Sequence, residues 1–386
     1  MRKTKVIIIT NIIAPYRVPL FNRLAKENWL DLKVFFCKSI TKDRQWDVPR
    51  GIRFKYRILK GITFSLKGRS YYKYRTVHFN PGLIPGLIKM EPDIVISAEY
   101  SIPSIMASFY CRAFGKKYIS WSEGIYYSDR NISLVQKFLR KIIISNARAC
   151  IGCSTDSKKQ YISLGAKPEK VFISIQTIDV KSFKRKCEMI RKEGKFQDKR
   201  KNNERIILYV GSLIVRKGVI HLLDAVKILA QKFNNFRLIL VGDGVEKNNL
   251  RNFCNENIFL DKVHFVGFQQ QPNLPNYYAI ADVFVLPTLE DTFGVVVNEA
   301  MAAGLPILCS KFAGAAGDLI KEGINGYRVD PNDHHKMANY LFKILTNDEL
   351  RLKMGKASEE IIKNYGIEAA TEGFLSAIRE TLKKRD

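Results

Sequence analysis

Two acidic positions flank a turn near the C-terminal end of the chain. Glu290 and Asp291 precede Phe293 and Gly294, and Glu299 follows that glycine by five residues. The turn comes after an apolar run, and a helix that begins there presents free N–H groups that suit a phosphate. Carboxylates would repel a phosphate, but they accept hydrogen bonds from hydroxyl groups. The pattern therefore predicts a ligand with both phosphate and hydroxyl groups, which describes a sugar nucleotide.

A glycine turn with two adjacent cations predicts where the phosphates bind. A strand is expected to end just before Gly211, and Arg216 and Lys217 stand before Gly218 at the start of a helix. Lys217 is expected to point at a diphosphate, because a charge-assisted hydrogen bond is about twice as strong as a neutral one. The alternative is an exposed Arg-Lys pair in front of a helix.

Two further glycine turns follow strands in the second half. Residues 241–244 (VGDG) lack the third glycine of a dinucleotide-binding pattern, so a tight turn is expected there. Phe268 follows Gly267 at the end of another strand. A nucleotide base is expected against Phe268, and the alternative is that Phe268 belongs to the core.

Short apolar runs alternate with amphipathic segments along the whole chain, which predicts an α/β protein with parallel, doubly wound sheets. The expected strands are 5–9, 32–36, 94–97, 118–121, 149–153, 171–175, 205–210, 237–241, 263–266, 283–286, 307–309 and 326–329. The charged stretch 184–203 has no apolar periodicity and is expected to be a linker or surface segment.

The alternation falls into two Rossmann-like domains facing a cleft. We expect an acceptor-binding domain at 1–200 and a sugar-nucleotide-binding domain at 201–366, with the C-terminal helix, 367–386, packing back on the first. Ligands of such sheets bind beyond the carboxyl ends of the strands. Glu123 follows a strand of the first domain and Arg17 lies at its first turn, so both are candidates. The alternatives are a helix-start carboxylate and a surface arginine.

Composition narrows the class of protein. The 386 residues are enough for two domains, and the hydrophobic share of 46% argues against disorder. No apolar run reaches the about 18–20 residues of a membrane-spanning helix, and the short apolar start lacks the features of a signal peptide. Seven scattered cysteines favour a reducing cytoplasm, and Cys150 and Cys153 are expected in the core.

The net charge of +27 is concentrated in one half of the chain. Residues 1–200 hold 41 Lys and Arg against 15 Asp and Glu, whereas the remainder holds 23 against 22. A one-sided basic surface attracts an anionic partner, either nucleic acid or an anionic membrane. Cations interleaved with aromatic residues at Arg44, Trp46 and 71–75 suit a lipid or sugar surface, and also single-stranded nucleic acid.

The histidines give no metal signal. His78, His221, His264, His334 and His335 show no metal-ligand spacing, and no Asp-x-Asp pair stands between apolar strands. We therefore expect no metal site.

Together these motifs resemble the retaining glycosyltransferases of family 4, which have the two-domain GT-B fold. The similarity runs almost continuously over 209–333 and is weaker in the first half. It rests on segments that match the family's motifs: 211–218, 266–268, the E-x7-E block around Gly294, 314–326, 11–17 and 121–124.

The resemblance implies roles for the acidic residues. Glu299 takes the place of the second E-x7-E carboxylate, which accepts the ribose hydroxyls. Asp291, or Glu290 beside it, takes the first place, which contacts hydroxyls of the transferred hexose, and the spacing leaves both open. Glu123 stands near a position where the family often has His, and it could orient the acceptor.

The resemblance also implies a donor-binding set. Lys217 matches the family's phosphate lysine. Ser212 replaces an arginine that the family often has after Gly211, and Arg216 is the candidate to substitute for it. Arg17 is a further candidate for the diphosphate or for an anionic acceptor. The expected donor contacts are Gly211, Ser212, Arg216, Lys217, Phe268, Phe293, Gly294, Val295 and Glu299.

The expected function is therefore that of a metal-independent, configuration-retaining hexosyltransferase. It would use a UDP- or GDP-linked donor, need no other cofactor, and act on a glycolipid or oligosaccharide acceptor of polysaccharide or lipopolysaccharide biosynthesis. We expect a cytoplasmic protein, peripheral at the inner face of the plasma membrane, with no nucleic-acid partner. The alternatives are a sugar-nucleotide epimerase, a phosphorylase, or a non-enzymatic basic binder of nucleic acid or membrane.

Overall fold

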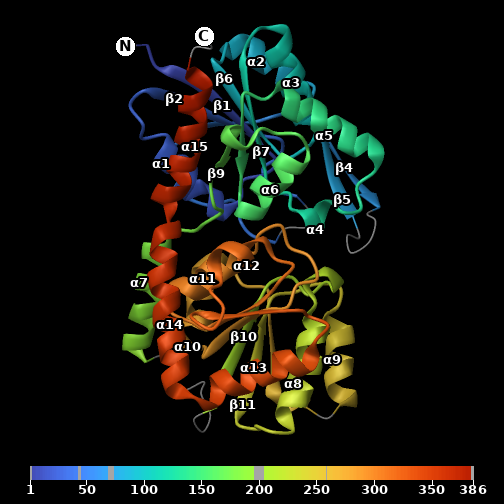
Figure 1. Cartoon of the computed structure of the whole chain (residues 1–386), viewed down its shortest axis with the longest axis vertical. Coiled ribbons are helices and arrows are strands. Elements are labelled where there is room, and N and C mark those ends of the chain that lie inside the picture. The colour runs from blue at the N-terminus through green and yellow to red at the C-terminus, as the bar shows by residue number, and fades with distance from the viewer. Residues whose placement is uncertain (1, 42–44, 68–73, 195–203, 258, 384–386) are drawn as a thin grey trace. The chain divides into compact units, whose positions relative to one another are not determined.

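The computed structural model describes residues 2–41, 45–67, 74–194, 204–257 and 259–383. It divides into two compact units, Met1–Thr177 with Ile367–Asp386, and Ile178–Gly366. Each unit is built on a parallel sheet with helices on both faces, which is the α/β architecture that the strand–helix alternation predicts (Figure 1).

The first unit has a seven-stranded parallel sheet in the order β3-β2-β1-β6-β7-β8-β9, and a separate antiparallel pair, β4-β5. The strands are β1 (Thr4–Thr10), β2 (Leu30–Phe36), β3 (Lys55–Ile58), β4 (Ile62–Lys67), β5 (Tyr74–Phe79), β6 (Ile94–Ala98), β7 (Lys117–Ser122), β8 (Ala149–Gly152) and β9 (Val171–Ile173).

The helices of this unit are α1 (Val18–Leu24), α2 (Leu83–Met90), α3 (Ile102–Ala113), α4 (Tyr126–Asp129), α5 (Leu134–Asn146), α6 (Thr155–Ser163) and α15 (Ile367–Leu382). Successive side chains of β1 point to opposite faces of the sheet. Val6 and Ile8 pack in the same core as α1 and α15, whereas Ile7 and Ile9 pack with α2 and α3. Both faces are therefore apolar, and helices cover both.

The second unit has a six-stranded parallel sheet in the order β12-β11-β10-β13-β14-β15. Its strands are β10 (Arg205–Val210), β11 (Phe236–Val241), β12 (Val263–Gly267), β13 (Val283–Leu286), β14 (Ile307–Ser310) and β15 (Gly326–Val329). All twelve expected strands of the two sheets are present, with ends within two residues of those expected.

The helices of the second unit surround this sheet. They are α7 (Val180–Glu193), α8 (Val219–Ala230), α9 (Lys247–Glu256), α10 (Leu274–Ile280), α11 (Val296–Ala302), α12 (Gly314–Leu319), α13 (His334–Thr346) and α14 (Asp348–Ile362), and a 3-10 turn, η4 (Val215–Lys217), precedes α8.

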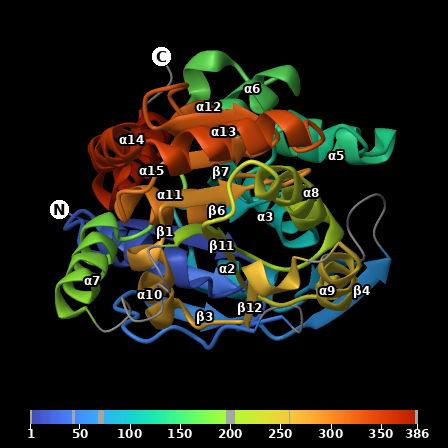
Figure 2. The same cartoon turned by 90° about the horizontal axis from the view of Figure 1, so that it is seen from below.

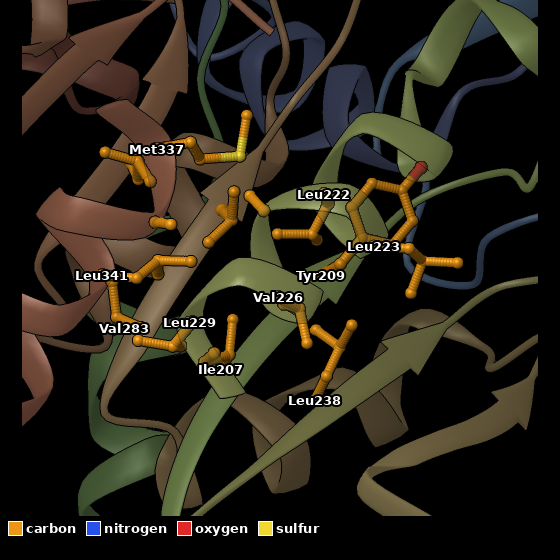
Figure 3. Close-up of a cluster of buried hydrophobic side chains, with 14 of the residues drawn as sticks. Ile207, Tyr209, Leu222, Leu223, Val226, Leu229, Leu238, Val283, Met337 and Leu341 are labelled. Atoms are coloured by element: carbon orange, nitrogen blue, oxygen red, sulfur yellow. The ribbon is translucent and has the colours of Figure 1, made fainter. Parts of the chain in front are cut away.

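Helices α8 and α13 lie side by side in both views (Figures 1 and 2). Figure 3 shows that Leu222 and Val226 of α8 and Met337 and Leu341 of α13 share one core with Ile207 of β10. The shared core fixes the two helices against each other and against the sheet, and so positions the residues at their first turns.

The stretch 184–203 was expected to be a linker or surface segment. The structure describes residues 184–194 of it and corrects this expectation there. Residues up to Glu193 belong to α7, which buries Val180, Phe183 and Cys187. These residues lie on one helix face, and the cations on the other faces obscure the pattern. Helix α7 packs on α10 and α11, so it belongs to the second unit, whereas the expected boundary lay near residue 200.

Three strands of the first unit were not expected. All four residues of β3 are exposed, so this edge strand lacks the apolar run that marks a buried strand. Strands β4 and β5 form the antiparallel pair. Of the predicted cation–aromatic cluster, residue 44 and residues 71–73 lie outside the described residues.

Candidate functional site

In the second unit, candidate residues from two distant segments meet where the strand order reverses. Strands β10 and β13 are neighbours in the sheet, although β11 and β12 lie between them in the sequence. Ligands of doubly wound sheets bind beyond the strand carboxyl ends at such a point. Lys217 follows β10 and Asp291 follows β13, and their side chains form an ion pair. The two motifs thus come together at the switch point of the sheet.

Hydrogen bonds hold the turn η4 against the loop that follows β13. The carbonyl oxygen of Arg216 accepts from the Leu289 N–H at 2.9 Å and from Thr288 Oγ1 at 3.0 Å. Arg216 Nη1 donates to the Glu290 carbonyl oxygen at 2.7 Å. Because both loops are fixed to each other through the main chain, Lys217 has a defined position.

Glycines allow three loops to approach one another at this edge. Gly218 has φ of +64°, and a Cβ there would lie 2.1 Å from the Pro287 carbonyl oxygen. A Cβ on Gly242 would lie 1.8 Å from the Gly211 carbonyl oxygen, and the Gly242 N–H donates to the Gly267 carbonyl oxygen at 2.9 Å. The loops after β10, β11 and β13 and the end of β12 therefore approach one another backbone to backbone.

Two opposing effects set the charge of Asp291, which is buried. Burial alone raises the pKa of this carboxyl, but the charges of Lys217 and Arg216 and the Phe293 N–H lower it below its ordinary value. Asp291 is therefore ionised at neutral pH and neutralises Lys217. A phosphate that binds Lys217 competes with this carboxylate.

Glu290, the other candidate for the first carboxylate position, is also buried. Its Oε1 has no hydrogen-bond partner among the described residues. A buried polar atom without a partner is unfavourable, so this oxygen is suited to accept a hydroxyl group.

The turn between the acidic positions resembles the one expected. Phe293 is buried, Gly294 has φ of +95°, and Val295 is the N-cap of α11. The helix expected over 295–303 is present as the seven-residue α11. This φ favours glycine at 294, and a Cβ there would also lie 2.8 Å from the end of the Leu286 side chain.

Glu299 lies on α11, and only 4% of its surface is exposed. The hydroxyl group of Tyr278 donates to Glu299 Oε2 at 2.8 Å. Burial raises the pKa of Glu299 to about 7, although the Tyr278 hydrogen bond acts in the opposite direction. Tyr278 is a site residue that the sequence analysis missed, since it lies within a short helix of another segment and no motif marks it.

The remaining donor candidates lie at the ends of neighbouring strands. Ser212 is exposed after Gly211, and its carbonyl oxygen accepts from the Tyr209 hydroxyl at 2.9 Å. Phe268 follows β12 directly and is half-buried.

The first unit brings its two candidates together. Arg17 is 8% exposed, so the alternative of a surface arginine is wrong, and it forms an ion pair with Glu123. Arg17 Nη1 also donates to Thr10 Oγ1 at 2.6 Å, and the guanidinium lies 4.6 Å from the centre of the Trp121 ring. Gln176 Nε2 donates to Glu123 Oε1 at 3.1 Å.

A third ionisable residue of this cluster, Glu99, was missed. Its Oε1 accepts from the Glu123 N–H at 3.2 Å and its Oε2 from Ser122 Oγ at 3.3 Å. Burial, followed by the charge of Glu123, raises the pKa of Glu99 to about 7. Glu99 has φ of +62°, a strained conformation for a residue other than glycine that is often found at functional sites. Its place directly after the apolar strand β6 is the signal that could have found it.

Two of the histidines that show no metal-ligand spacing in the sequence lie together. His221 Nδ1 is 3.0 Å from His334 Nε2, although 113 residues separate them in the sequence. Spacing along the chain cannot reveal such a pair. Cys150 and Cys153 are buried, which confirms their expected place in the core.

No helix among the described residues is both long and apolar enough to cross a membrane.

In comparisons with known proteins, most of the second unit matches a family model. Residues 190–361 match the family model described as "Glycosyl transferases group 1". An uncharacterized glycosyltransferase of Haemophilus influenzae is 32% identical over 172 residues, which are 45% of this chain and 48% of that protein. The lipopolysaccharide 1,2-N-acetylglucosaminetransferase of Salmonella typhimurium is 28% identical over 188 residues, 46% of this chain and 49% of that protein. The chain thus spans about half the length of the curated relatives that it matches.

Solved structures extend the likeness to both units. Anabaena HepE in complex with UDP-glucose has a TM-score of 0.73 at 15% identity, over 97% of this chain and 99% of that one. At this identity the likeness shows the fold, which is that of the GT-B glycosyltransferases: two doubly wound α/β units with parallel sheets.

Proposed function

We propose that this protein is a glycosyltransferase that moves a hexose from a nucleotide-sugar donor to a hydroxyl group of an acceptor. The observation that carries the proposal is the Lys217–Asp291 pair at the switch point of the second sheet, together with the buried Glu299 in the first turn of α11, the helix that follows Asp291. These residues lie within the segment that matches the glycosyltransferase family. HepE, with a similar fold, is described in complex with UDP-glucose, and this supports a UDP-linked donor.

Each charged group has a task in donor binding. Lys217 binds the diphosphate, and Asp291 holds its ammonium group in place until the phosphates arrive. Glu299 accepts the ribose hydroxyls, and either Asp291 or the unpaired Oε1 of Glu290 accepts a hydroxyl of the hexose. The main chain at Gly211 and Gly294 comes close to the donor, which a side chain at either glycine would hinder.

The proposed chemistry follows from where charge develops. Breaking the glycosyl–phosphate bond leaves an oxocarbenium-like sugar and a more negative diphosphate. A fixed cation such as Lys217 stabilises this charge, and a well-placed donor of this kind contributes about 3–4 kcal/mol. In this proposal the anomeric configuration is retained, the departing phosphate takes the acceptor proton, and neither a metal ion nor another cofactor takes part.

We propose that the first unit binds the acceptor. The buried Arg17 and the partly buried Glu123 and Glu99 form a cluster of ionisable groups after the carboxyl ends of β1, β6 and β7. Strands β1 and β6 are the point at which the order of this sheet reverses, the usual place for a ligand. Glu123 orients the acceptor hydroxyl, and Arg17 fixes the Glu123 carboxylate or meets an anionic group of the acceptor.

The charge of the first unit supports an acceptor at an anionic membrane. This unit carries 36 Lys and Arg against 15 Asp and Glu, a net charge of +21, whereas the second unit carries 28 against 22. Helix α5 exposes Leu134, Val135 and Phe138, and Lys137 and Lys141 are exposed on the same helix. Apolar and basic side chains together are typical of a helix that lies on a membrane surface. We therefore propose a glycolipid or lipid-linked oligosaccharide acceptor at the cytoplasmic face of the plasma membrane.

Donor turnover in Lys217→Ala and Glu299→Gln tests the function. A panel of UDP- and GDP-sugars first identifies the donor by thermal shift, since a ligand at about 100 times its Kd adds about 2.7 kcal/mol of stability. We expect both variants to lose turnover, while Lys227→Ala on α8 and Glu256→Gln on α9, both exposed, retain it. Full turnover in Lys217→Ala and Glu299→Gln would overturn the proposal.

A further inference from the structure

Three side chains with metal-binding atoms meet between the first two turns of α8 and the first turn of α13. His221 and Asp224 are three residues apart on α8 and share one helix face. His334 is the first residue of α13. His334 Nε2 lies 3.0 Å from His221 Nδ1 and 3.9 Å from Asp224 Oδ2, and the three ligand atoms lie within 4.8 Å of one another.

The spacing of these atoms suits a divalent transition-metal ion. In a tetrahedral site with Zn–N bonds of about 2.0–2.1 Å, two ligand atoms lie about 3.3 Å apart. The two ring nitrogens are close to this separation, and the carboxylate oxygen needs only a small side-chain rotation to reach it. Two imidazoles and one carboxylate leave a fourth position for water, and they are ligands that Zn²⁺ accepts.

Solvent access also favours an ion at this place. The side chains of His334 and Asp224 are 30% and 32% exposed, so an ion reaches them from solvent. Asp330, the other acidic residue near His221, is paired with Lys311 at 2.8 Å.

A direct hydrogen bond between the two rings is the competing explanation. A neutral imidazole donates at one nitrogen and accepts at the other, so one ring can donate to the other across 3.0 Å. That bond gives no role to Asp224, whose carboxylate oxygen at 3.9 Å is beyond hydrogen-bond distance. A shared ion gives a role to all three side chains.

We propose that His221 Nδ1, His334 Nε2 and Asp224 Oδ2 bind a divalent transition-metal ion of the Zn²⁺ type. The ion joins the first turn of α8 to the first turn of α13. The backbone N–H of His221 donates to the Gly218 carbonyl oxygen at 3.0 Å, so His221 belongs to the helix start that follows Lys217. An ion held by His221 therefore stabilises this helix start. The site is structural, and it does not depend on the proposed transferase activity.

Metal titration of the full chain tests this site directly. The protein is freed of any affinity tag, stripped with a chelator, and titrated with Co²⁺ while its visible absorption is recorded, then with Zn²⁺ by calorimetry. We expect one saturable Co²⁺ site with histidine-type absorption, displaced by Zn²⁺. His221→Ala and His334→Ala each weaken Zn²⁺ binding by about 100-fold or more, because even a change beside a ligand weakens binding by about 10–100-fold.

His335 supplies the matched control, since it is exposed and adjacent to His334. His335→Ala binds Zn²⁺ as the unaltered chain does, and Zn²⁺ raises the thermal midpoint of both but not that of His334→Ala. His334→Gln replaces His334→Ala if the latter does not fold. Absence of a saturable Co²⁺ site, or equal Zn²⁺ affinity in His334→Gln and His335→Ala, would show that the two rings form only a hydrogen bond.

Discussion

Burial raises the pKa of Glu299 to about 7 from an ordinary value of 4.5, and this makes donor binding depend on pH. A carboxyl group accepts hydroxyl groups at both oxygens only in its ionised form. We predict that affinity for the nucleotide rises as the pH passes upward through about 7, as calorimetry between about pH 6 and pH 8 would show. Glu299→Gln should bind more weakly and show less dependence on pH. A wild-type affinity that falls over this range would contradict the role of Glu299.

The same shift predicts how Glu299 affects stability. The pKa is higher in the folded state, so the folded protein binds the proton more tightly. The stabilisation from the protonated carboxyl is fully present below about pH 4.5 and is lost as the pH rises through about 7. Glu299→Gln has no ionisable group at this position, so it lacks this loss of stability. As the pH rises through this range, the free energy of unfolding of the wild type should therefore fall relative to that of the variant, as urea denaturation would measure.

The buried pair of Lys217 and Asp291 predicts a coupled pair of substitutions. Removing one partner of a buried ion pair costs about 3–5 kcal/mol, since it leaves the other charge without a partner. Lys217→Ala and Asp291→Ala should each destabilise the protein, and the double variant should lose less than the sum by about 0.5–3 kcal/mol. Denaturant unfolding of the four proteins measures this coupling. Strict additivity would mean that the pair does not interact in solution.

At the level of elements, the approach of η4 to the loop after β13 depends on Gly218. An alanine there meets the Pro287 carbonyl oxygen at 2.1 Å and also adopts φ of +64°. Gly323 is the matched control, with φ of +73° and nothing within 4 Å of an added Cβ. We predict that Gly323→Ala lowers the free energy of unfolding by about 1–2 kcal/mol, because alanine is strained at this positive φ. Gly218→Ala should cost about 1–3 kcal/mol more and weaken nucleotide binding, and equal costs would contradict the close approach.

The elements also show what the sequence can and cannot predict. The buried strands are continuous apolar runs, so β10 and β13 were predicted with their correct bounds. Helix α7 was missed because only Val180, Phe183 and Cys187 are buried among many cations, and β3 because it is an exposed edge strand. The pattern of apolar residues along the chain shows which face of a helix or strand is buried. It does not show which distant segment packs against that face.

The candidate site follows the same rule. Lys217, Asp291 and Glu299 stand at strand ends and in a motif, and each was predicted from the sequence. Tyr278 and the pairing of His221 with His334 were not, because contacts between distant segments bring them to their partners. Glu99 could have been predicted by the reasoning that selected Glu123, since both directly follow a buried strand.

At the scale of the whole molecule, the uneven charge predicts salt-sensitive membrane binding. Because the first unit has a net charge of +21, the protein should sediment with anionic vesicles at low salt and dissociate from them as the salt concentration rises. Phe138→Ser should weaken this binding, because 63% of that side chain is exposed on α5. Leu352→Ser on α14, which is 70% exposed in the other unit, is the control. Equal sedimentation of the two variants would contradict the role of α5.

The most direct measurement is the equilibrium binding of UDP and GDP to the wild type and to Lys217→Ala, by calorimetry near neutral pH. Hydrogen bonds to charged groups contribute about 1.5–3 kcal/mol, so the wild type should bind one of the two diphosphates about 10–100-fold more tightly than the variant. Lys227→Ala should match the wild type. If neither diphosphate binds, or if Lys217→Ala binds as tightly as the wild type, the second unit does not hold a nucleotide at the switch point of its sheet.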